Sequence, residues 1–169
     1  MDRIYKTDDN YKYCMLGKKD DSYFEITSQL EEEITKPNLR MYGGKLYSTV
    51  GLYFPELVIY VKDILTNKTL GYMGITEYYG KGLYISQIAV REPNRRMGVA
   101  TTLVDEAARI ADERGIDTIS ADIARDNDAS LAFFGSLGFT GEGRHFISTQ
   151  EYLDKKKEKN GENEKTRTI

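Results

Sequence analysis

The chain has 169 residues, with 24 Lys or Arg against 27 Asp or Glu and a formal net charge of -3. This length suits one domain, and the balanced charge excludes a polycationic nucleic-acid coat. One cysteine and one histidine exclude a disulfide framework and a Cys/His zinc site within the chain, so no metal is expected. Since no run of about 18 apolar residues and no signal-peptide core is present, we expect a cytoplasmic protein without a membrane partner.

The first half of the chain predicts one helix and three strands. Residues 21–36 predict a helix that ends before Pro37. Its expected buried face consists of three apolar residues, Phe24, Leu30 and Ile34. Residues 55–62 and 70–79 are rich in β-branched and aromatic side chains and flank a turn, so they predict an antiparallel hairpin. After a second turn, residues 83–90 predict a third strand.

The second half predicts two helices and two strands. Apolar residues recur at three- and four-residue steps over 99–114, which predicts a helix that Gly115 ends. Residues 118–124 predict a short, nearly apolar strand, and 128–137 a second helix. Residues 139–147 predict a final strand interrupted by two glycines, Gly141 and Gly143.

The last sixteen residues differ in composition from the rest. Residues 154–169 contain six Lys or Arg and four Asp or Glu, and only Ile169 is apolar. Such a segment cannot offset its ordering entropy by burial, so we expect a disordered tail after a domain that covers 1–153. A basic partner-binding tail is the alternative, which the mixed charge signs disfavour.

One strand-to-helix junction combines features of an anion site. The strand at 85–90 runs through a short basic loop into a helix N-terminus, where backbone N–H groups lack intrahelical partners. Gly98 and Ala100 place almost no side chain over those groups, and Arg95 and Arg96 add positive charge. This pattern favours a phosphate or pyrophosphate cradle. A plain turn with two solvated arginines remains the alternative. The P-loop and dinucleotide motifs are absent, which disfavours a nucleotide-binding regulator.

Two motifs in this order resemble one family. Arg95-x-x-Gly98-x-Ala100 matches the [QR]-x-x-G-x-[GA] signature of the GCN5-related N-acetyltransferase (GNAT) superfamily. One helix and one strand later, residues 127–139 resemble that family's N-x-x-A-(apolar)-x-(apolar)-Y-x-x-x-G-F segment. The resemblance covers roughly residues 52–147. It implies an α/β GNAT fold: a mixed, mostly antiparallel twisted sheet with helices on both faces and a cofactor cleft between splayed fourth and fifth strands.

The resemblance also implies acetyl-coenzyme A (acetyl-CoA) as donor and a set of binding residues. The family's pantetheine arm pairs with the fourth strand, here Ile88, Ala89 and Val90. Its pyrophosphate lies on the segment that corresponds to Arg95, Arg96, Met97, Gly98, Val99, Ala100 and Thr101. Asn127 matches the family asparagine that faces the cofactor arm. Helix capping, by Asn127 or by Asp126, is the alternative interpretation.

The family's usual proton donor is absent. Members often protonate the departing thiolate with the tyrosine of the second motif, and Phe134 occupies that position here. We still expect Phe134 to border the cofactor. Candidate substitutes are Tyr78, Tyr79, Tyr84 and His145. Otherwise the thiolate leaves unassisted, or the protein binds acetyl-CoA without turnover.

Two carboxylates are candidate catalytic bases. Asp122 lies between apolar neighbours on the expected fifth strand, where some ribosomal-protein-acetylating members carry a glutamate. Desolvation there would raise its pKa toward a useful range. The alternative is a structural Asp at a strand edge. Glu77 is the second candidate, and an ordered water the third.

The expected function is acetyl transfer from acetyl-CoA to a primary amine. Attack is expected to be direct, without an acyl-enzyme, because Cys14 lies far from the matching motifs. The acceptor, a protein or peptide amine or a small molecule, stays open because the fold hosts both. The rival is a non-catalytic acetyl-CoA-binding or sensing module. A homodimer is left open, and no nucleic-acid partner is expected.

Overall fold

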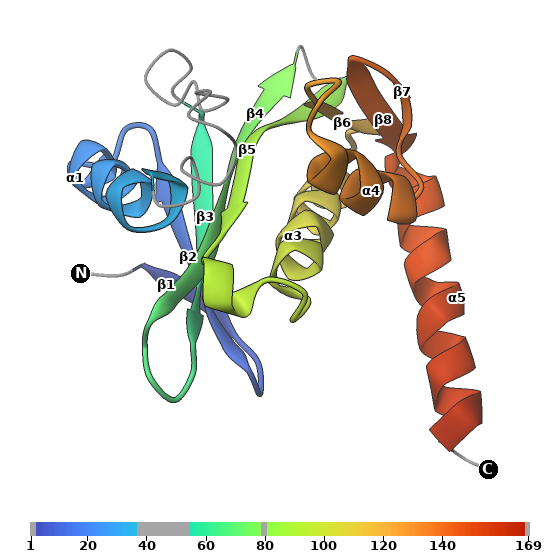
Figure 1. Cartoon of the computed structure of the whole chain (residues 1–169), viewed down its shortest axis with the longest axis horizontal. Coiled ribbons are helices and arrows are strands. Elements are labelled where there is room, and N and C mark those ends of the chain that lie inside the picture. The colour runs from blue at the N-terminus through green and yellow to red at the C-terminus, as the bar shows by residue number, and fades with distance from the viewer. Residues whose placement is uncertain (1–2, 37–54, 79–80, 168–169) are drawn as a thin grey trace. The chain divides into compact units, whose positions relative to one another are not determined.

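The computed structural model describes residues 3–36, 55–78 and 81–167. Within these residues, eight strands form one mostly antiparallel sheet in the order β1-β2-β3-β4-β5-β6-β8-β7 (Figure 1). The strands are β1 (Ile4–Thr7), β2 (Tyr11–Gly17), β3 (Leu57–Asp63), β4 (Thr69–Tyr78), β5 (Gly82–Val90), β6 (Thr118–Asp122), β7 (Thr140–Glu142) and β8 (Arg144–Ser148). The helical elements are α1 (Tyr23–Leu30), a π-helical turn η1 (Glu31–Thr35), a 3-10 turn η3 (Glu92–Asn94), α3 (Val99–Glu113), α4 (Asp128–Ser136) and α5 (Thr149–Arg167). The α/β fold class is therefore confirmed.

The chain divides into two compact units. The first contains residues 1–76 and 85–106, and the second contains residues 77–84 and 107–169. The strands β4 and β5 and the helix α3 each contribute to both units.

In the first unit, the predicted hairpin is confirmed. Strands β3 and β4 pair antiparallel, with Val58 opposite Gly74, and their bounds lie within two residues of the prediction. The turn between them uses Asn67 at a positive φ of 59°, a conformation that asparagine tolerates better than most residues. Strand β2 pairs antiparallel with β3 on its other side. Neither β1 nor β2 was predicted from the sequence.

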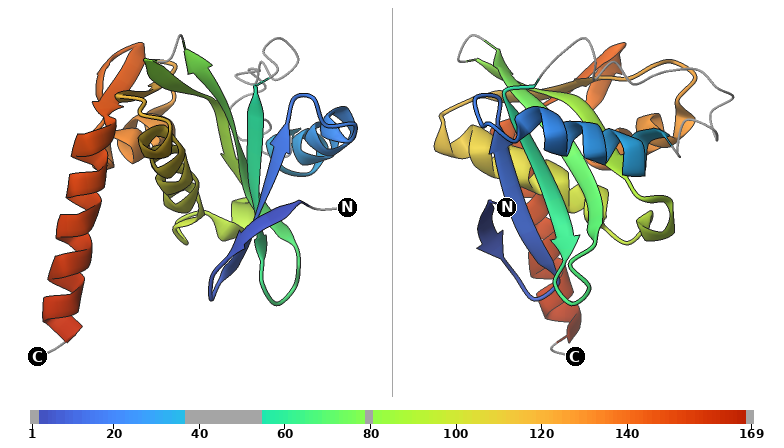
Figure 2. Two further views of the ribbon diagram at one scale, coloured as in Figure 1. Left: turned by 180° about the vertical axis from the view of Figure 1, so that it is seen from behind. Right: turned by 90° about the vertical axis from the view of Figure 1, so that its left-hand side faces the viewer.

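The helix α1 and the turn η1 bury two of the three residues expected in their core-facing side, Leu30 and Ile34, but not Phe24. The helix covers the face of β2 and β3 (Figure 2), and the core-facing residues are Tyr23, Leu30 and, in η1, Ile34. Phe24 was expected in this face and is instead 60% exposed. Positions 23, 30 and 34 lie seven and four residues apart, on one helical stripe, and position 24 is turned away from it by about 100°.

A buried carboxylate fixes the first strand to α3. Glu106 is 2% exposed and accepts hydrogen bonds from Tyr5 Oη at 2.8 Å and Lys6 Nζ at 2.6 Å. A buried carboxylate is tolerated only when its oxygens are paired in this way. The edge strand of the first unit is therefore held by one side chain of α3, the helix that begins at Val99.

In the second unit, the last predicted strand is two strands. Strand β6 pairs antiparallel with β8, with Ile119 opposite Ile147, and β7 folds back on β8. A Cβ on Gly141 would lie 2.2 Å from the Arg144 carbonyl oxygen, and Gly143 has a positive φ of 70°. The two glycines therefore permit a tight hairpin rather than interrupting a single strand.

The charged C-terminal segment also differs from the expectation. Residues 154–167 are helical, as the continuation of α5, where the sequence suggested a disordered tail. Lys and Glu favour helices, and the pair Lys155–Glu151 adds an i,i+4 contact at 2.8 Å. After Tyr152, which is buried, the helix contributes almost no buried side chains. Within the described part of the chain, no helix is both long and apolar enough to cross a membrane.

Candidate functional site

The first turn of α3 has the shape of an anion cradle. Arg96 and Gly98 adopt positive φ values of 62° and 83°, which turn the chain into the helix. A Cβ at Gly98 would meet no heavy atom within 4 Å, so open space lies in front of this turn. The amide of Thr102 donates to the Gly98 carbonyl at 3.0 Å, so the helical ladder begins there. The N–H groups of the first turn are directed out of this end of the helix, toward that space.

The side chains of this turn separate into an anchor and an exposed rim. Val99 is 1% exposed and anchors the turn in the core. Arg96 and Met97 are exposed, and Met97 keeps 64% of its surface. The remaining predicted pyrophosphate residues are Arg95, Ala100 and Thr101, all partly buried.

Arg91 fixes the strand that leads into the cradle. Its backbone N–H donates to the Leu70 carbonyl at 2.8 Å, and its Nε donates to the Thr69 carbonyl at 2.9 Å. Its Nη2 also forms an ion pair with Glu33 of η1 at 3.1 Å. These bonds hold the end of β5 against β4 and η1.

A close backbone approach supports the same junction. A Cβ at Gly71 of β4 would lie 2.9 Å from the Ala89 carbonyl oxygen and 3.1 Å from Val99 Cγ1. Only glycine allows β4 to lie this close to β5 and to the start of α3. Ile88, Ala89 and Val90, the predicted pantetheine contacts, are partly buried at this end of β5.

In the second unit, Asn127 caps α4. Its side-chain oxygen accepts the Ser130 amide at 3.2 Å, so the capping interpretation is confirmed for Asn127 rather than for Asp126. Contact with the cofactor arm stays a prediction.

Phe134 lies inside the second unit rather than on its surface. It is 3% exposed, and its ring makes edge contacts with Phe133 and Phe139 at centroid distances of 5.0 Å. No proton donor is available from this position.

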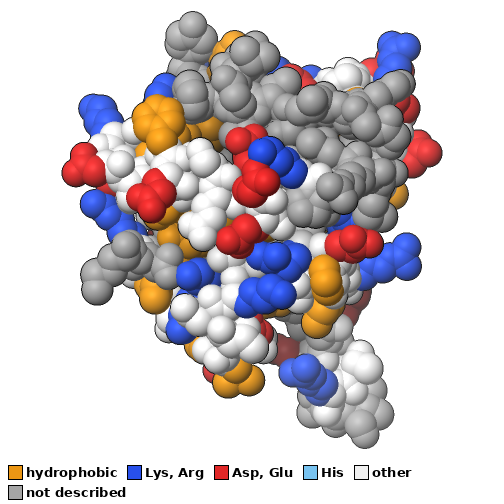
Figure 3. All heavy atoms as spheres, turned by 60° about the vertical axis from the view of Figure 1, so that its left-hand side comes forward, with side chains coloured by type: hydrophobic (Ala, Val, Ile, Leu, Met, Phe, Trp, Pro, Cys, Tyr) orange, Lys and Arg blue, Asp and Glu red, His pale blue; other side chains and the backbone are white. Residues whose placement is uncertain are grey.

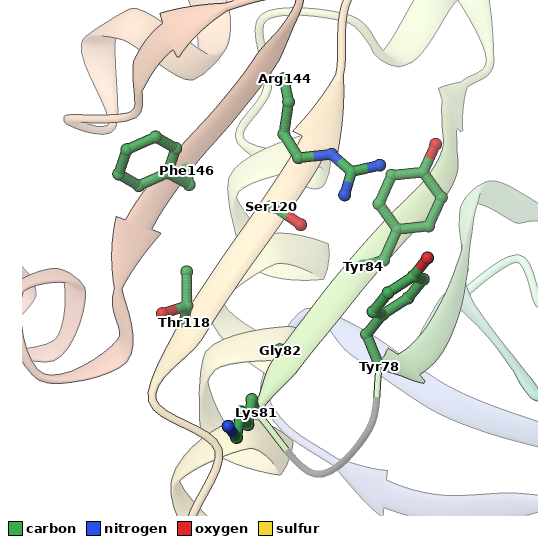
Figure 4. Close-up of a pocket in the computed structure, with 8 residues that line it drawn as sticks. All are labelled: Tyr78, Lys81, Gly82, Tyr84, Thr118, Ser120, Arg144 and Phe146. Carbon is green, nitrogen blue, oxygen red and sulfur yellow. The ribbon is translucent and has the colours of Figure 1, made fainter.

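A shallow pocket of about 300 Å³ opens on one face of the second unit (Figure 4). It is lined by Tyr78, Lys81, Gly82, Tyr84, Thr118, Ser120, Arg144 and Phe146. Side chains alternate between the two faces of β6, so Thr118 and Ser120 form the floor of the pocket. Ile119 and Ala121 are buried on the opposite face. In Figure 4, Arg144 extends between Ser120 and Tyr84, and Phe146 lies on the other side of β6.

Asp122, Arg144 and Tyr84 form a hydrogen-bonded cluster at one end of this pocket. Arg144 donates from Nε and Nη2 to the two Asp122 oxygens at 2.8 and 3.2 Å. The Tyr84 hydroxyl donates to Asp122 Oδ2 at 3.3 Å, and the guanidinium lies 5.3 Å from the centre of the Tyr84 ring. The arrangement joins a proton-bearing hydroxyl, a carboxylate and a fixed cation.

The electrostatics of Asp122 contradict the expectation of a raised pKa. Its side chain is about half exposed, and the hydrogen bonds from Arg144 hold the pKa of the carboxyl below its usual value. Asp122 is therefore ionised at neutral pH and is a weak base. The sequence suggested desolvation because both neighbours are apolar, but the alternation of β6 turns Asp122 away from them.

The other candidate groups lie elsewhere. Glu77 pairs with Arg114 at 3.2 Å, next to Tyr78 but on the opposite side of an alternating strand. His145 donates from Nδ1 to the Gly143 carbonyl at 3.2 Å and alternates with the two pocket residues of β8. Tyr79 lies outside the described residues. Sequence reasoning missed Arg144 and Lys81, because no local pattern connects them to Asp122.

The described surface carries both signs of charge. On the face drawn in Figure 3, acidic and basic side chains are interspersed. On this face the charge distribution differs from the basic stripe of a nucleic-acid-binding protein.

The comparisons with known proteins agree with this geometry. The model of the Acetyltransferase (GNAT) family matches residues 22–139, and the chain belongs to that family. Acetyl-CoA is the acyl-donor cosubstrate of the family. No curated protein sequence matches the chain.

Several solved structures share the fold at low sequence identity. Ard1 from Thermoplasma volcanium is 19% identical with a TM-score of 0.61, over 80% of this chain and 97% of that one. A GNAT-family acetyltransferase from Staphylococcus aureus Mu50 is 13% identical with a TM-score of 0.59, over 81% and 99%. A GNAT-family acetyltransferase from Elizabethkingia anophelis, solved with acetyl-CoA bound, is 13% identical with a TM-score of 0.52, over 79% and 78%.

Proposed function

We propose that the chain transfers the acetyl group of acetyl-CoA to a primary amine by direct attack. The observation that carries this proposal is the open first turn of α3. There the family signature coincides with a positive φ at Gly98 and free space in front of it. A helix N-terminus with two adjacent arginines suits a pyrophosphate. The residues present therefore fit the cosubstrate.

The cosubstrate supplies an activated thioester. The N–H groups of residues 97–101, with Arg95 and Arg96, hold its pyrophosphate, and the backbone of Ile88 to Val90 pairs with its pantetheine arm. Asn127, which caps α4, matches the family asparagine that faces this arm, and the two roles are compatible. The backbone groups among these contacts are already fixed by the fold, so little backbone ordering is needed on binding.

Tyr84 is the proposed proton donor. The C–N bond forms as the amine attacks the thioester carbonyl, and the C–S bond breaks as the thiolate leaves. Tyr84 gives its hydroxyl proton to the sulfur and regains one from the protonated nitrogen of the product. Before the transfer the Tyr84 hydroxyl donates its hydrogen bond to Asp122, whose pKa is lowered. The hydroxyl then turns from Asp122 to the sulfur, and Arg144 stabilises the negative charge that develops beside the ring. In this account Asp122 is a positioning residue, and Glu77 has no part in the proton transfer.

Two measurements on the purified chain, made one after the other, test the proposal. Calorimetry with acetyl-CoA, ATP and NAD should give binding only for acetyl-CoA. An assay of free thiol release over a panel of amines should then give amine-dependent release with at least one acceptor. Binding of ATP or NAD in preference to acetyl-CoA would refute the cofactor assignment.

A non-catalytic acetyl-CoA-binding module is the second candidate. The observation that favours it is Phe134, a buried phenyl ring at the family's tyrosine position. This candidate predicts tight acetyl-CoA binding without thiol release for every amine in the panel.

A further inference from the structure

The pocket of the second unit carries a positive charge that nothing in it neutralises. Its carboxylate, Asp122, is already held by both donor arms of Arg144. Lys81, at the other end of the lining, is exposed and makes no ion pair with any described residue. A cationic group in this setting attracts an anion and repels a second cation.

The rest of the lining suits an anionic group attached to an apolar one. Thr118 and Ser120 place hydroxyl groups on the floor, and hydroxyls donate readily to carboxylate oxygens. Tyr78 and Phe146 are about half exposed and present ring surface on opposite sides of β6. A side chain lying between them buries apolar area on both faces.

The distance between Lys81 and Tyr84 sets the length of the ligand that the pocket can hold. Lys81 lies in the turn immediately before β5, three residues before Tyr84, so their Cα atoms are at most about 10 Å apart at roughly 3.3 Å per residue. An extended peptide of three residues spans about the same distance. An amine placed at Tyr84 would therefore bring the side chain of the third residue near Lys81.

We propose that this pocket selects acceptors with a primary amine and an anionic group about 10 Å apart. The inference rests on the proposed function, in which the amine reacts beside Tyr84. The same chemistry has two sources: a peptide amino terminus with an acidic third residue, or a free amino acid whose amine and carboxylate are separated by a comparable chain. Polyamines, which carry a second cation instead, are poor acceptors.

Matched peptides test the selection. Three peptides with free amino termini, identical except for Glu, Ala or Lys at the third residue, are compared by kcat/KM at saturating acetyl-CoA. The kcat/KM of the Glu peptide should exceed that of the Lys peptide by about tenfold, the size expected for one well-placed charge contact. An amino acid of similar span forms the second arm and shows whether the peptide backbone is needed. Equal rates for the three peptides, with the amino acid unselected against a polyamine, would overturn the proposal.

Charge reversal identifies the residue responsible. Lys81→Glu should lower the preference for the Glu peptide about tenfold or invert it, and added salt should weaken the preference in the parent chain. Lys157→Glu, which changes an exposed lysine of α5 outside the pocket, is the matched control and should leave the preference unchanged. A preference that survives Lys81→Glu refutes the assignment of the anion to this pocket.

A binding measurement distinguishes a failure of this inference from a failure of the proposed function. If no acceptor is acetylated, the proposed function fails, and fluorescence anisotropy with labelled peptides still reports the selection. Tighter binding of the Glu peptide that is lost in Lys81→Glu would support the pocket alone. Turnover with no dependence on the third residue, and with no selection of the amino acid over a polyamine, would refute the pocket alone.

Discussion

The first turn of α3 and the pocket beside β6 present different kinds of atoms to a ligand. At the turn, backbone N–H groups and a missing side chain at Gly98 form the proposed acetyl-CoA site. In the pocket, side chains from β6, β8 and the hairpin of β4 and β5 converge, and two cations and three aromatic rings define its chemistry. A backbone site suits a constant partner, such as a cosubstrate shared by a whole family. A side-chain site can change acceptor by single substitutions.

The largest effect should come from removing the proposed donor in the pocket. Tyr84→Phe keeps the ring beside Arg144 and deletes only the hydroxyl. We expect kcat to fall by roughly 10²–10⁴-fold, the usual contribution of a positioned general acid, with acetyl-CoA affinity unchanged. Rates of thiol release and calorimetry of the same variant measure the two quantities. Unchanged kcat would remove Tyr84 from the mechanism.

Phe134→Tyr is the companion variant at the family's usual position. If Tyr84 already supplies the proton, this added hydroxyl should raise kcat little. It should also lower the free energy of unfolding by about 1–3 kcal/mol, because a hydroxyl enters a cluster of buried rings. A gain of roughly 10²-fold or more would instead mean that the parent chain lacks a working donor.

The proposed acetyl-CoA site at the first turn of α3 is tested by placing a side chain in its open space. Gly98→Glu places a carboxylate and bulk in the open space before the α3 turn, so acetyl-CoA affinity should fall at least about tenfold, or 1.4 kcal/mol. Gly115→Glu is the matched control, because Gly115 also has a positive φ with nothing near its Cβ but lies at the other end of the helix. Both variants carry similar backbone strain, so calorimetry should separate them only if the cradle binds phosphate. Equal affinities would contradict the cradle.

A smaller effect is expected for the charge pair of the pocket. Arg144→Gln removes the main cause of the lowered Asp122 pKa, so that pKa should rise toward its usual value near 4. In the parent chain the pair is complete above about pH 4 and is lost as pH falls through the lowered pKa. Carboxyl-carbon NMR follows the titration in both chains. An identical Asp122 titration would show that the pair does not form in solution.

The smallest effect should come from deleting residues 154–169. This part of α5 buries almost nothing, so the melting temperature should stay within about 1–2 °C of the parent value. Kinetics of the truncated chain should match as well, because neither region uses these residues. A drop of several degrees would show that the segment packs on the domain in solution.

Much of the fold could be predicted because its signals are local. The hairpin of β3 and β4, the helix α3 and the capped start of α4 follow from turn residues, apolar spacing and Asn127. Strand β1 could not be predicted, because its exposed side chains gain their partner far along the chain. Tyr5 and Lys6 bond to Glu106, about a hundred residues away. The helix after residue 153 cannot be predicted from burial, because it buries almost nothing, and the helix propensity of its Lys and Glu residues is the signal that indicates it.

The α3 turn and the pocket also differ in how far apart in the sequence their residues lie. The open α3 turn could be predicted because Arg95, Gly98 and Ala100 are neighbours in sequence, and its role as a phosphate cradle stays a prediction. The pocket could not be predicted, because Asp122 depends on Arg144, which reaches it only through the pairing of β6 with β8. That pairing reverses the expected sign of the Asp122 pKa shift, since a fixed guanidinium outweighs partial burial.

The independence of the two regions can be measured in one experiment. The acetyl-CoA Kd from calorimetry and the KM of an acidic peptide at saturating acetyl-CoA are determined for the parent chain, Gly98→Glu and Lys81→Glu. The account predicts that Gly98→Glu weakens acetyl-CoA binding at least about tenfold with little change in peptide KM, and that Lys81→Glu raises the peptide KM with the acetyl-CoA Kd unchanged. The account would be contradicted by a Lys81→Glu variant that loses acetyl-CoA affinity or a Gly98→Glu variant that keeps it, because the α3 turn is proposed to bind acetyl-CoA and the pocket to bind the acceptor.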